Sequence, residues 1–228
     1  QVLVSTMNQG DVRKLVRSMK IKSCIVINQV TKKIVSPKDI SEQGLQAYTV
    51  EERGLSRSRN RAIKKATADV CLIADDDMYY TKDYERVVLD AYTDHPDADI
   101  ITFFVDNEDS TQVAKIQPYG RLNLLQTMKV TSCQISFKRN SIIDKNLLMD
   151  ENFGTGTDKY MGEENIFLFD CYKKGLRIYN VPQKIAVLRG DNISTWFEGY
   201  DRKYFLVKGA VYYRMSSWLC PLLIIQFS

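Results

Sequence analysis

A short apolar run that ends in consecutive aspartates sets the strongest limit on how this chain can fold. The run VCLIA, at residues 70–74, has the length and composition of a buried strand, and Asp75, Asp76 and Asp77 follow it directly. Because three like charges repel one another, the strand has to end at water or at a cation. Ligands of open α/β sheets bind at the carboxyl ends of strands, so the segment is a candidate metal site. A solvated acidic turn is the alternative.

The rest of the first half alternates predicted strands with predicted helices. Strands are expected at residues 2–5, 24–27, 47–50 and 100–105, and helices after an Asp11 cap, over 56–65, and from a Thr81 cap to Pro96. The second half is less regular, with strands expected at 134–137 and 185–188 and helices at 163–174 and 204–212. This order predicts a single-domain α/β fold with a mostly parallel sheet flanked by helices.

Composition and charge exclude several classes of protein. Of 228 residues, 44% are hydrophobic and 26% charged, which is typical of a globular domain, and a net charge of +4 is too small to indicate nucleic-acid binding. The five cysteines are scattered without a CxxC pair and His95 is the single histidine, so neither a disulfide framework nor a structural zinc site is expected. We expect a reduced, cytoplasmic protein.

The C-terminal apolar run, residues 218–225, is shorter than the ~20 residues that a membrane span needs. It is either a helix that closes the core or an interfacial anchor. Basic residues precede it, at Arg202, Lys203, Lys208 and Arg214. We therefore keep peripheral contact with the inner face of the plasma membrane as an expectation.

Three segments carry candidate chemistry. Asp75 and Asp77 form a DxD pair, whose hard oxygen ligands suit Mg²⁺ or Mn²⁺ beside a diphosphate. In GLSRSRN, residues 54–60, a glycine turn and a basic helix start either bring Arg59 to an anionic ligand or only pin the acidic strand.

The third segment is GEEN, residues 162–165, which follows the glycine loop NFGTG at 152–156. A carboxylate at a helix start is stabilised by the helix dipole, and we expect it to be ionised and able to accept a proton from a hydroxyl group. Ordinary acidity of a helix N-terminus is the alternative.

The order of these motifs resembles the family-2 glycosyltransferases of the inverting, GT-A type, as found in bacterial surface-polysaccharide synthesis. The resemblance runs from Val2 to about Trp196 and includes Ser194-Thr195-Trp196 after the last core strand. It implies a GT-A, Rossmann-like sheet in one domain of residues 1–228. Residues 1–110 would bind the nucleotide sugar, and residues 111–228, with the C-terminal helices, would bind the acceptor.

The resemblance also implies roles for single residues. Glu164 would be the catalytic base and Glu163 its neighbour, while Asp75 and Asp77 would hold Mn²⁺ or Mg²⁺. The residues that would contact the nucleotide sugar are Thr6, Asn8, Asn28, Arg59, Asp75, Asp76 and Arg189. Two positions depart from the family: Asn28 stands where an aspartate often contacts uracil, and Arg189 stands in the region where many relatives have a histidine.

We therefore expect transfer of a sugar from a nucleoside diphosphate sugar, a UDP-sugar in particular, to a saccharide or lipid-linked acceptor. Two other functions stay open at this point. A metal-dependent nucleotidyltransferase also uses paired aspartates at a strand end but does not need Glu164. A non-catalytic domain that binds sugar nucleotides would keep the fold without turnover.

Overall fold

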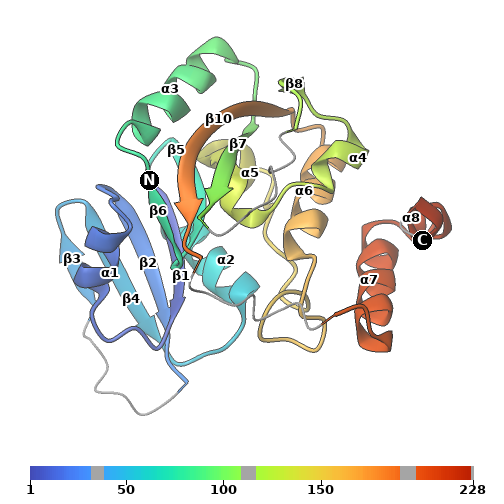
Figure 1. The fold of residues 1–228 in the computed structure, drawn as a ribbon, viewed down its shortest axis with the longest axis horizontal. Helices are drawn as coiled ribbons and strands as arrows, with labels where there is room; N and C mark the ends of the chain where they lie inside the picture. Colours follow the sequence, from blue (N-terminus) through green and yellow to red (C-terminus); the bar gives the residue numbers. More distant parts are fainter. Residues whose placement is uncertain (32–38, 109–116, 191–198, 227–228) are drawn as a thin grey trace.

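A large mixed sheet organises the protein, for which we describe a computed structural model (Figure 1). The structure describes residues 1–31, 39–108, 117–190 and 199–226. Within these residues the strand order is β3-β4-β2-β1-β5-β9-β7-β10-β6, and β8 pairs with β10. Strands β4, β2, β1 and β5 run parallel to one another, and so do β7 and β10. Strand β9 lies between β5 and β7 and is antiparallel to both.

The strands are β1 (Val2–Met7), β2 (Cys24–Gln29), β3 (Ile40–Glu42), β4 (Leu45–Val50), β5 (Val70–Asp75), β6 (Met78–Tyr80), β7 (Ile100–Asn107), β8 (Gly120–Arg121), β9 (Ile135–Lys138) and β10 (Ile178–Leu188). The helices are α1 (Val12–Ser18), α2 (Leu55–Lys65), α3 (Tyr84–Asp94), α4 (Leu124–Thr127), α5 (Arg139–Ile143), α6 (Glu163–Lys173), α7 (Arg202–Met215) and α8 (Cys220–Gln226), with a 3₁₀ turn, η1, at Ser132–Gln134.

Alternating side chains of the strands build a core on each face of the sheet. Val2 and Val4 of β1 point to the face covered by α1 and α3, and Leu3 between them points to the face covered by α2, α5 and α6. All three are buried. Because both faces are covered, the central strands are continuously apolar rather than alternating with polar residues. The expectation of an α/β sheet flanked by helices is confirmed.

The sequence interpretation was wrong about how the chain leaves β5. Helix α3 begins after Asp83 rather than after a Thr81 cap. Residues 78–80 form the short strand β6, which pairs antiparallel with the end of β10, so that Leu188 lies opposite Met78. A three-residue strand carries no periodic signal of its own, because its pairing depends on a partner far along the chain. Ser194-Thr195-Trp196 lies outside the described residues.

Helices α7 and α8 form a third layer at one end of the molecule, next to α6 (Figure 1). Val211 of α7 packs against Gly162, the residue that precedes α6. Gly162 has φ +87°, and a Cβ atom there would lie 2.5 Å from Cγ2 of Val211. Since no side chain fits at that distance, the glycine lets α7 approach the start of α6.

We predict that Gly162→Ala destabilises the protein more than Gly175→Ala. Both glycines have a positive φ, but a Cβ at Gly175 meets no atom within 4 Å. The two variants therefore share a backbone strain of about 1–2 kcal/mol, and only Gly162→Ala adds a steric clash of about 1–3 kcal/mol. Urea unfolding measures both changes in the free energy of unfolding. Equal losses would show that Val211 moves aside without cost.

Candidate active site

The carboxyl ends of several strands bring the aspartate triplet together with residues from distant parts of the chain. Strands β1 and β5 are neighbours, with Ser5 opposite Asp75. The Thr6 hydroxyl donates a hydrogen bond to the Asp76 carboxylate. On the other side, the backbone N–H of Arg189 donates to the carbonyl of Asp77, at 2.8 Å. Thr6, Asp76 and Arg189 therefore lie close together at the carboxyl ends of the strands, which we call the sheet edge.

The guanidinium of Arg59 lies at the centre of this edge. Its Nη1 is 2.8 Å from Oε1 of Glu163, and its Nη2 is 2.7 Å from Oδ1 of Asp75. Nη2 also donates to the Ser132 hydroxyl at 2.8 Å. The side chain is only 2% exposed. Burial lowers the pKa of Arg59, but Asp75 and Glu163 outweigh that effect and hold the pKa above its ordinary value.

These contacts bear on the two roles that the sequence left open for Arg59. We expected a cation facing an anionic ligand, whereas the structure places Arg59 between two carboxylates of the protein. The alternative, that Arg59 pins the acidic strand, describes the geometry better, and Arg59 pins Glu163 as well.

The segment GLSRSRN also holds the glycine loop in place. The Ser56 hydroxyl donates to the carbonyl of Phe153 at 2.6 Å, and the N–H of Leu55 donates to the carbonyl of Thr155 at 2.9 Å. The Asn60 amide bonds both the N–H and the carbonyl of Met149. These bonds hold the loop that leads to the acid pair of α6 against the start of α2.

The two acids at the start of α6 lie in different surroundings. Glu163 is buried and bound to Arg59, while Glu164 is half-buried. Burial raises the pKa of Glu164 well above its ordinary value, and the neighbouring charge of Glu163 raises it further. Loss of water around the carboxylate thus opposes the stabilisation that we expected from the helix start, and it outweighs the backbone N–H groups.

Sequence reasoning missed Lys208 as a neighbour of the site. It was grouped with the basic residues before the C-terminal run, but α7 brings it within electrostatic reach of Glu164. Burial lowers the pKa of Lys208, and the charge of Glu164 opposes that shift. A lysine on α7 gives no sequence signal for this position, because the position depends on how α7 packs against α6.

Two predicted nucleotide contacts have structural partners of their own. The Asn28 side chain accepts from the N–H of Gln9 and donates to its carbonyl, at 3.0 and 2.9 Å. Asn8 has φ +53° and bonds the backbone N–H and the hydroxyl of Thr31. The hydrogen bonds of both asparagines thus connect the segments that follow β1 and β2. Their contacts with a nucleotide stay predictions.

The residues present fit a divalent cation only in part. Asp75 and Asp77 offer hard carboxylate oxygens, and the Asp75 side chain is 32% exposed. Within the described residues, no group of three or more His, Cys, Asp or Glu residues is arranged to hold a metal ion. The protein would therefore supply two carboxylates, and the remaining ligands would come from phosphate oxygens and water.

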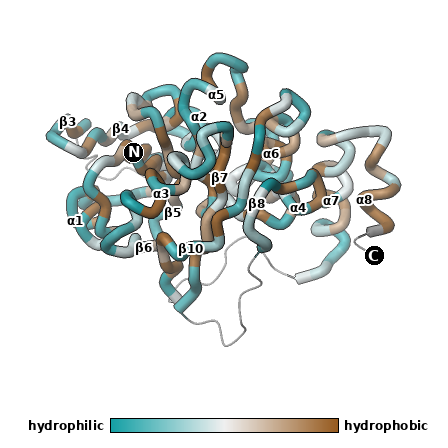
Figure 2. The backbone as a smooth tube through the Cα atoms, turned by 90° about the horizontal axis from the view of Figure 1, so that it is seen from above, coloured by the Kyte–Doolittle hydropathy of each residue, from teal (hydrophilic) through white to brown (hydrophobic). Residues whose placement is uncertain are grey.

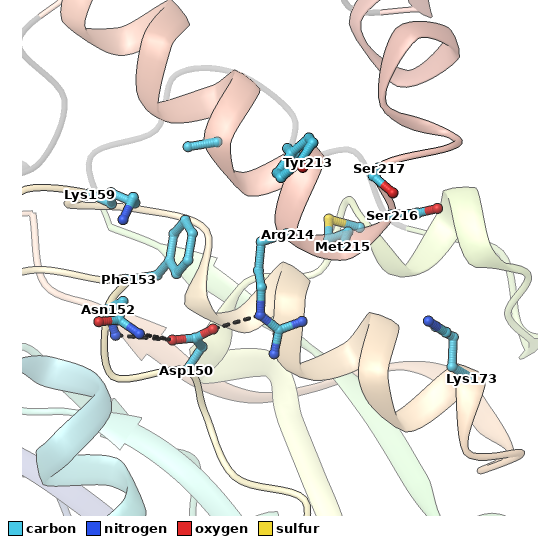
Figure 3. A pocket seen from close by; sticks show the side chains of 11 residues that line it. Asp150, Asn152, Phe153, Lys159, Lys173, Tyr213, Arg214, Met215, Ser216 and Ser217 are labelled. Carbon is cyan, nitrogen blue, oxygen red and sulfur yellow. Dashed lines mark hydrogen bonds and ion pairs between the residues drawn. The ribbon is translucent and has the colours of Figure 1, made fainter.

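A pocket of about 630 Å³ lies elsewhere, between α7 and the 150–159 loop (Figure 3). Arg214 lies across it and pairs with Asp150 and Asp170. Phe153 and Tyr213 line its apolar part. None of the predicted site residues lines this pocket.

Solved structures share the fold at low sequence identity. Residues 1–349 of S. aureus TarS in complex with UDP-GlcNAc match with a TM-score of 0.68 and 14% identity, over 94% of this chain and 66% of that one. The complex with UDP matches with a TM-score of 0.66 and 15% identity, over 93% and 64%. A further structure of S. aureus TarS matches with a TM-score of 0.65 and 15% identity, over 92% of this chain and 38% of that one.

This chain thus spans less than two thirds of those structures. No curated protein matches it. Residues 24–157, more than half of the chain, match the family described as Glycosyl transferase family 2. They include the GLSRSRN segment, the aspartate triplet and the glycine loop, and they end just before the acid pair. The chain therefore belongs to glycosyl transferase family 2 and has the GT-A fold.

Proposed function

We propose that this glycosyltransferase moves a sugar, with inversion, from a nucleoside diphosphate sugar to an acceptor hydroxyl group. One observation carries the proposal: the aspartate triplet and the acid pair of α6 meet on one buried guanidinium, Arg59. This arrangement supports a binding site for the diphosphate beside a base for the acceptor. A single displacement needs both, and it needs no protein nucleophile.

Glu164 is the proposed base. Its raised pKa makes it a stronger base than an ordinary carboxylate, because a group holds a proton more firmly where its charged form is poorly solvated. It would take the proton of the acceptor hydroxyl as that oxygen attacks the anomeric carbon. The diphosphate would leave from the opposite face of the sugar.

Asp75 and Asp77 are the proposed ligands of Mn²⁺ or Mg²⁺, which when bound would neutralise charge on the leaving diphosphate. Arg189 would help from the other side, since its backbone N–H bonds the carbonyl of Asp77. Burial raises the pKa of Asp76, and the charge of Arg189 opposes that shift. The Arg189 guanidinium also donates to the carbonyl of Ser18, at 2.8 Å. Thr6, Asn8 and Asn28 would lie toward the nucleoside.

The donor is proposed to be a UDP-sugar. Structures of TarS with UDP-GlcNAc and with UDP support this choice through the shared fold. The acceptor is proposed to be a saccharide or a lipid-linked saccharide, in polysaccharide or glycolipid synthesis. A nucleotidyltransferase accounts less well for the site, because it gives no task to Glu164. A domain that only binds sugar nucleotides, without turnover, gives no task to the raised pKa of Glu164.

Replacement of the base gives the most direct test. We predict that Glu164→Gln lowers the rate of UDP release from UDP-GlcNAc by about 10²–10⁴-fold, the usual contribution of a general base. Calorimetry should show that Glu164→Gln still binds UDP-GlcNAc in the presence of Mn²⁺. Glu51→Gln, at an exposed glutamate, is the matched control and should keep the wild-type rate. Undiminished turnover by Glu164→Gln would reject its role as the base.

Metal removal gives a second test. We predict that EDTA abolishes UDP release and that added Mn²⁺ restores it. The departing diphosphate is negatively charged, and next to two anionic aspartates it needs a cation to neutralise that charge. Asp77→Asn should weaken Mn²⁺-dependent binding of UDP in calorimetry. Asp83→Asn, which removes an exposed carboxylate nearby in sequence, should not. Full turnover in EDTA would contradict the metal assignment.

The C-terminal helices are proposed to contact a membrane surface. Their exposed apolar residues include Phe205, Leu206, Tyr213, Trp218, Leu222 and Ile225. Arg202 and Lys203 are exposed at the start of α7. Figure 2 shows hydrophobic residues along α8, at one end of the molecule. An exposed apolar surface beside basic residues is typical of interfacial anchors, and it suits a lipid-linked acceptor on the inner face of the plasma membrane. In the described residues, no helix is long and apolar enough to cross a bilayer.

Flotation with vesicles that contain phosphatidylglycerol tests this surface. We predict that the wild-type protein floats with the vesicles and that the double variant Trp218→Ser, Leu222→Ser floats several-fold less. Leu89→Ser removes a similarly exposed leucine from α3 and should float like the wild type. Equal flotation of all three proteins would rule out the C-terminal helices as the contact.

A further inference from the structure

The pocket beside α7 is a candidate binding site that the proposed reaction does not use (Figure 3). Its volume of about 630 Å³ lies within the ~300–1,000 Å³ that is usual for ligand sites. Three parts of the chain build it: the 150–159 loop, the end of α6, and α7 with the residues that follow it. Aromatic and polar side chains both line the pocket, so its ligand has to offer both kinds of surface.

A network of charged side chains fixes the shape of the pocket. Nε of Arg214, on α7, donates to Oδ2 of Asp150 at 2.6 Å, and Nη2 lies 3.0 Å from Oδ2 of Asp170 on α6. Asp150 also accepts from the backbone and the side chain of Asn152, at 3.1 and 2.9 Å. The loop, α6 and α7 are thereby tied to one another. A site that is already ordered costs less to occupy than one that orders on binding.

The pocket carries an excess of positive charge. Arg214 is matched by its two aspartates, whereas within the described residues Lys159 and Lys173, which also line the pocket, form no ion pair. Their ammonium groups lie over the rings of Phe153 and Phe169, at 5.1 and 5.5 Å from the ring centres. Two ammonium groups at one pocket favour a ligand that is negatively charged.

Tyr213 gives the pocket an open aromatic surface. It is 67% exposed although it lines the pocket, so its ring is accessible to a ligand. Ser216, Ser217 and Asn152 add hydroxyl and amide groups to the same lining. A pyranose ring has an apolar C–H face and a rim of hydroxyl groups, which match an open aromatic ring with polar side chains around it. A wholly apolar ligand would leave these polar groups without partners.

The pocket and the acid pair of α6 share one loop. The Phe153 side chain lines the pocket, while the Phe153 carbonyl accepts the Ser56 hydroxyl at 2.6 Å. The next residue, Gly154, packs against Glu163, so that a Cβ there would lie 3.0 Å from Cδ of that acid. Consecutive residues of the loop therefore contact the pocket and the acid pair. An acceptor chain that passes this loop would meet both.

We propose that this pocket binds an acidic saccharide segment of the acceptor, away from the hydroxyl group that reacts. The Tyr213 ring stacks on the apolar face of a sugar, and Lys159 and Lys173 contact its carboxylate or phosphate group. Asn152 and the two serines bond its hydroxyl groups. This inference rests on the proposed function for the saccharide nature of the acceptor. It makes the pocket a selector of the acceptor chain and gives it no part in the chemistry.

Binding to an array of immobilised oligosaccharides, without any donor, tests the proposal. The array presents neutral glycans beside glycans of the same length that carry uronic acid or phosphate groups, so it also tells the two kinds of anion apart. We predict that the wild-type protein binds acidic glycans more tightly than neutral ones, and that added salt reduces the difference. Binding of no acidic glycan, or equal binding of acidic and neutral glycans, would overturn the proposal.

Exposed positions allow the pocket to be altered without disturbing the core. Tyr213→Ala should weaken binding of the acidic glycans about tenfold, through loss of one aromatic contact. Tyr172→Ala removes an exposed tyrosine of α6 that does not line the pocket and should bind like the wild type. Lys173→Glu should weaken binding several-fold, and Lys174→Glu, outside the lining, far less. Thermal unfolding checks that each variant is folded. Unchanged binding by Tyr213→Ala and Lys173→Glu would remove the pocket from consideration.

These outcomes are separate from those of the proposed reaction. If Tyr213→Ala loses glycan binding but Glu164→Gln keeps full turnover, the pocket stands and the catalytic role of Glu164 fails. If Glu164→Gln is inactive but both pocket variants bind like the wild type, the base is correct and the pocket is overturned. The membrane contact is tested at Trp218 and Leu222, which do not line the pocket.

Discussion

A single buried cation organises this active site. Arg59 is almost completely enclosed, and it pairs with Asp75 from β5 and Glu163 from α6. Removing a guanidinium from water is costly, and close charged partners recover much of that cost. Both Nη atoms of Arg59 are bonded, while its buried Nε has no partner among the described residues. The strand end, the η1 turn and the start of α6 must therefore all be in place before this charge can be buried. Loss of any one of them would leave the buried guanidinium without one of its hydrogen-bond or charge partners.

The same short segment that carries Arg59 also positions the loop in front of the acids. Ser56 and Asn60 bond the backbone at Phe153 and Met149, and both are buried. A buried side chain that bonds a backbone group costs little, because each polar atom finds a partner. GLSRSRN is thus mainly a structural hub. The sequence offered its basic residues as one side of a phosphate site, but Arg59 pairs with two carboxylates of the protein itself.

Much of the fold could be predicted because it rests on local patterns. The apolar runs of β1, β2 and β5 and the Asp11 cap of α1 stand out in the sequence, and the structure confirms them. The 78–80 strand and the true start of α3 could not be predicted, because β6 exists only through its pairing with β10. The acids at 75–77 and 163–164 could be found as motifs, but the charge state of Glu164 depends on burial that no local pattern reports.

The sequence by itself determined where the acidic groups lie relative to strand and helix ends, since the carboxylates follow an apolar run in one case and open a helix in the other. Only the tertiary structure decided which charges meet. Arg59 and Glu163 are 104 residues apart, and Lys208 reaches Glu164 only through the packing of α7 on α6. The physical reason is that the energy of a charge depends on its solvent exposure and its neighbours in space, and both arise only once distant segments pack together.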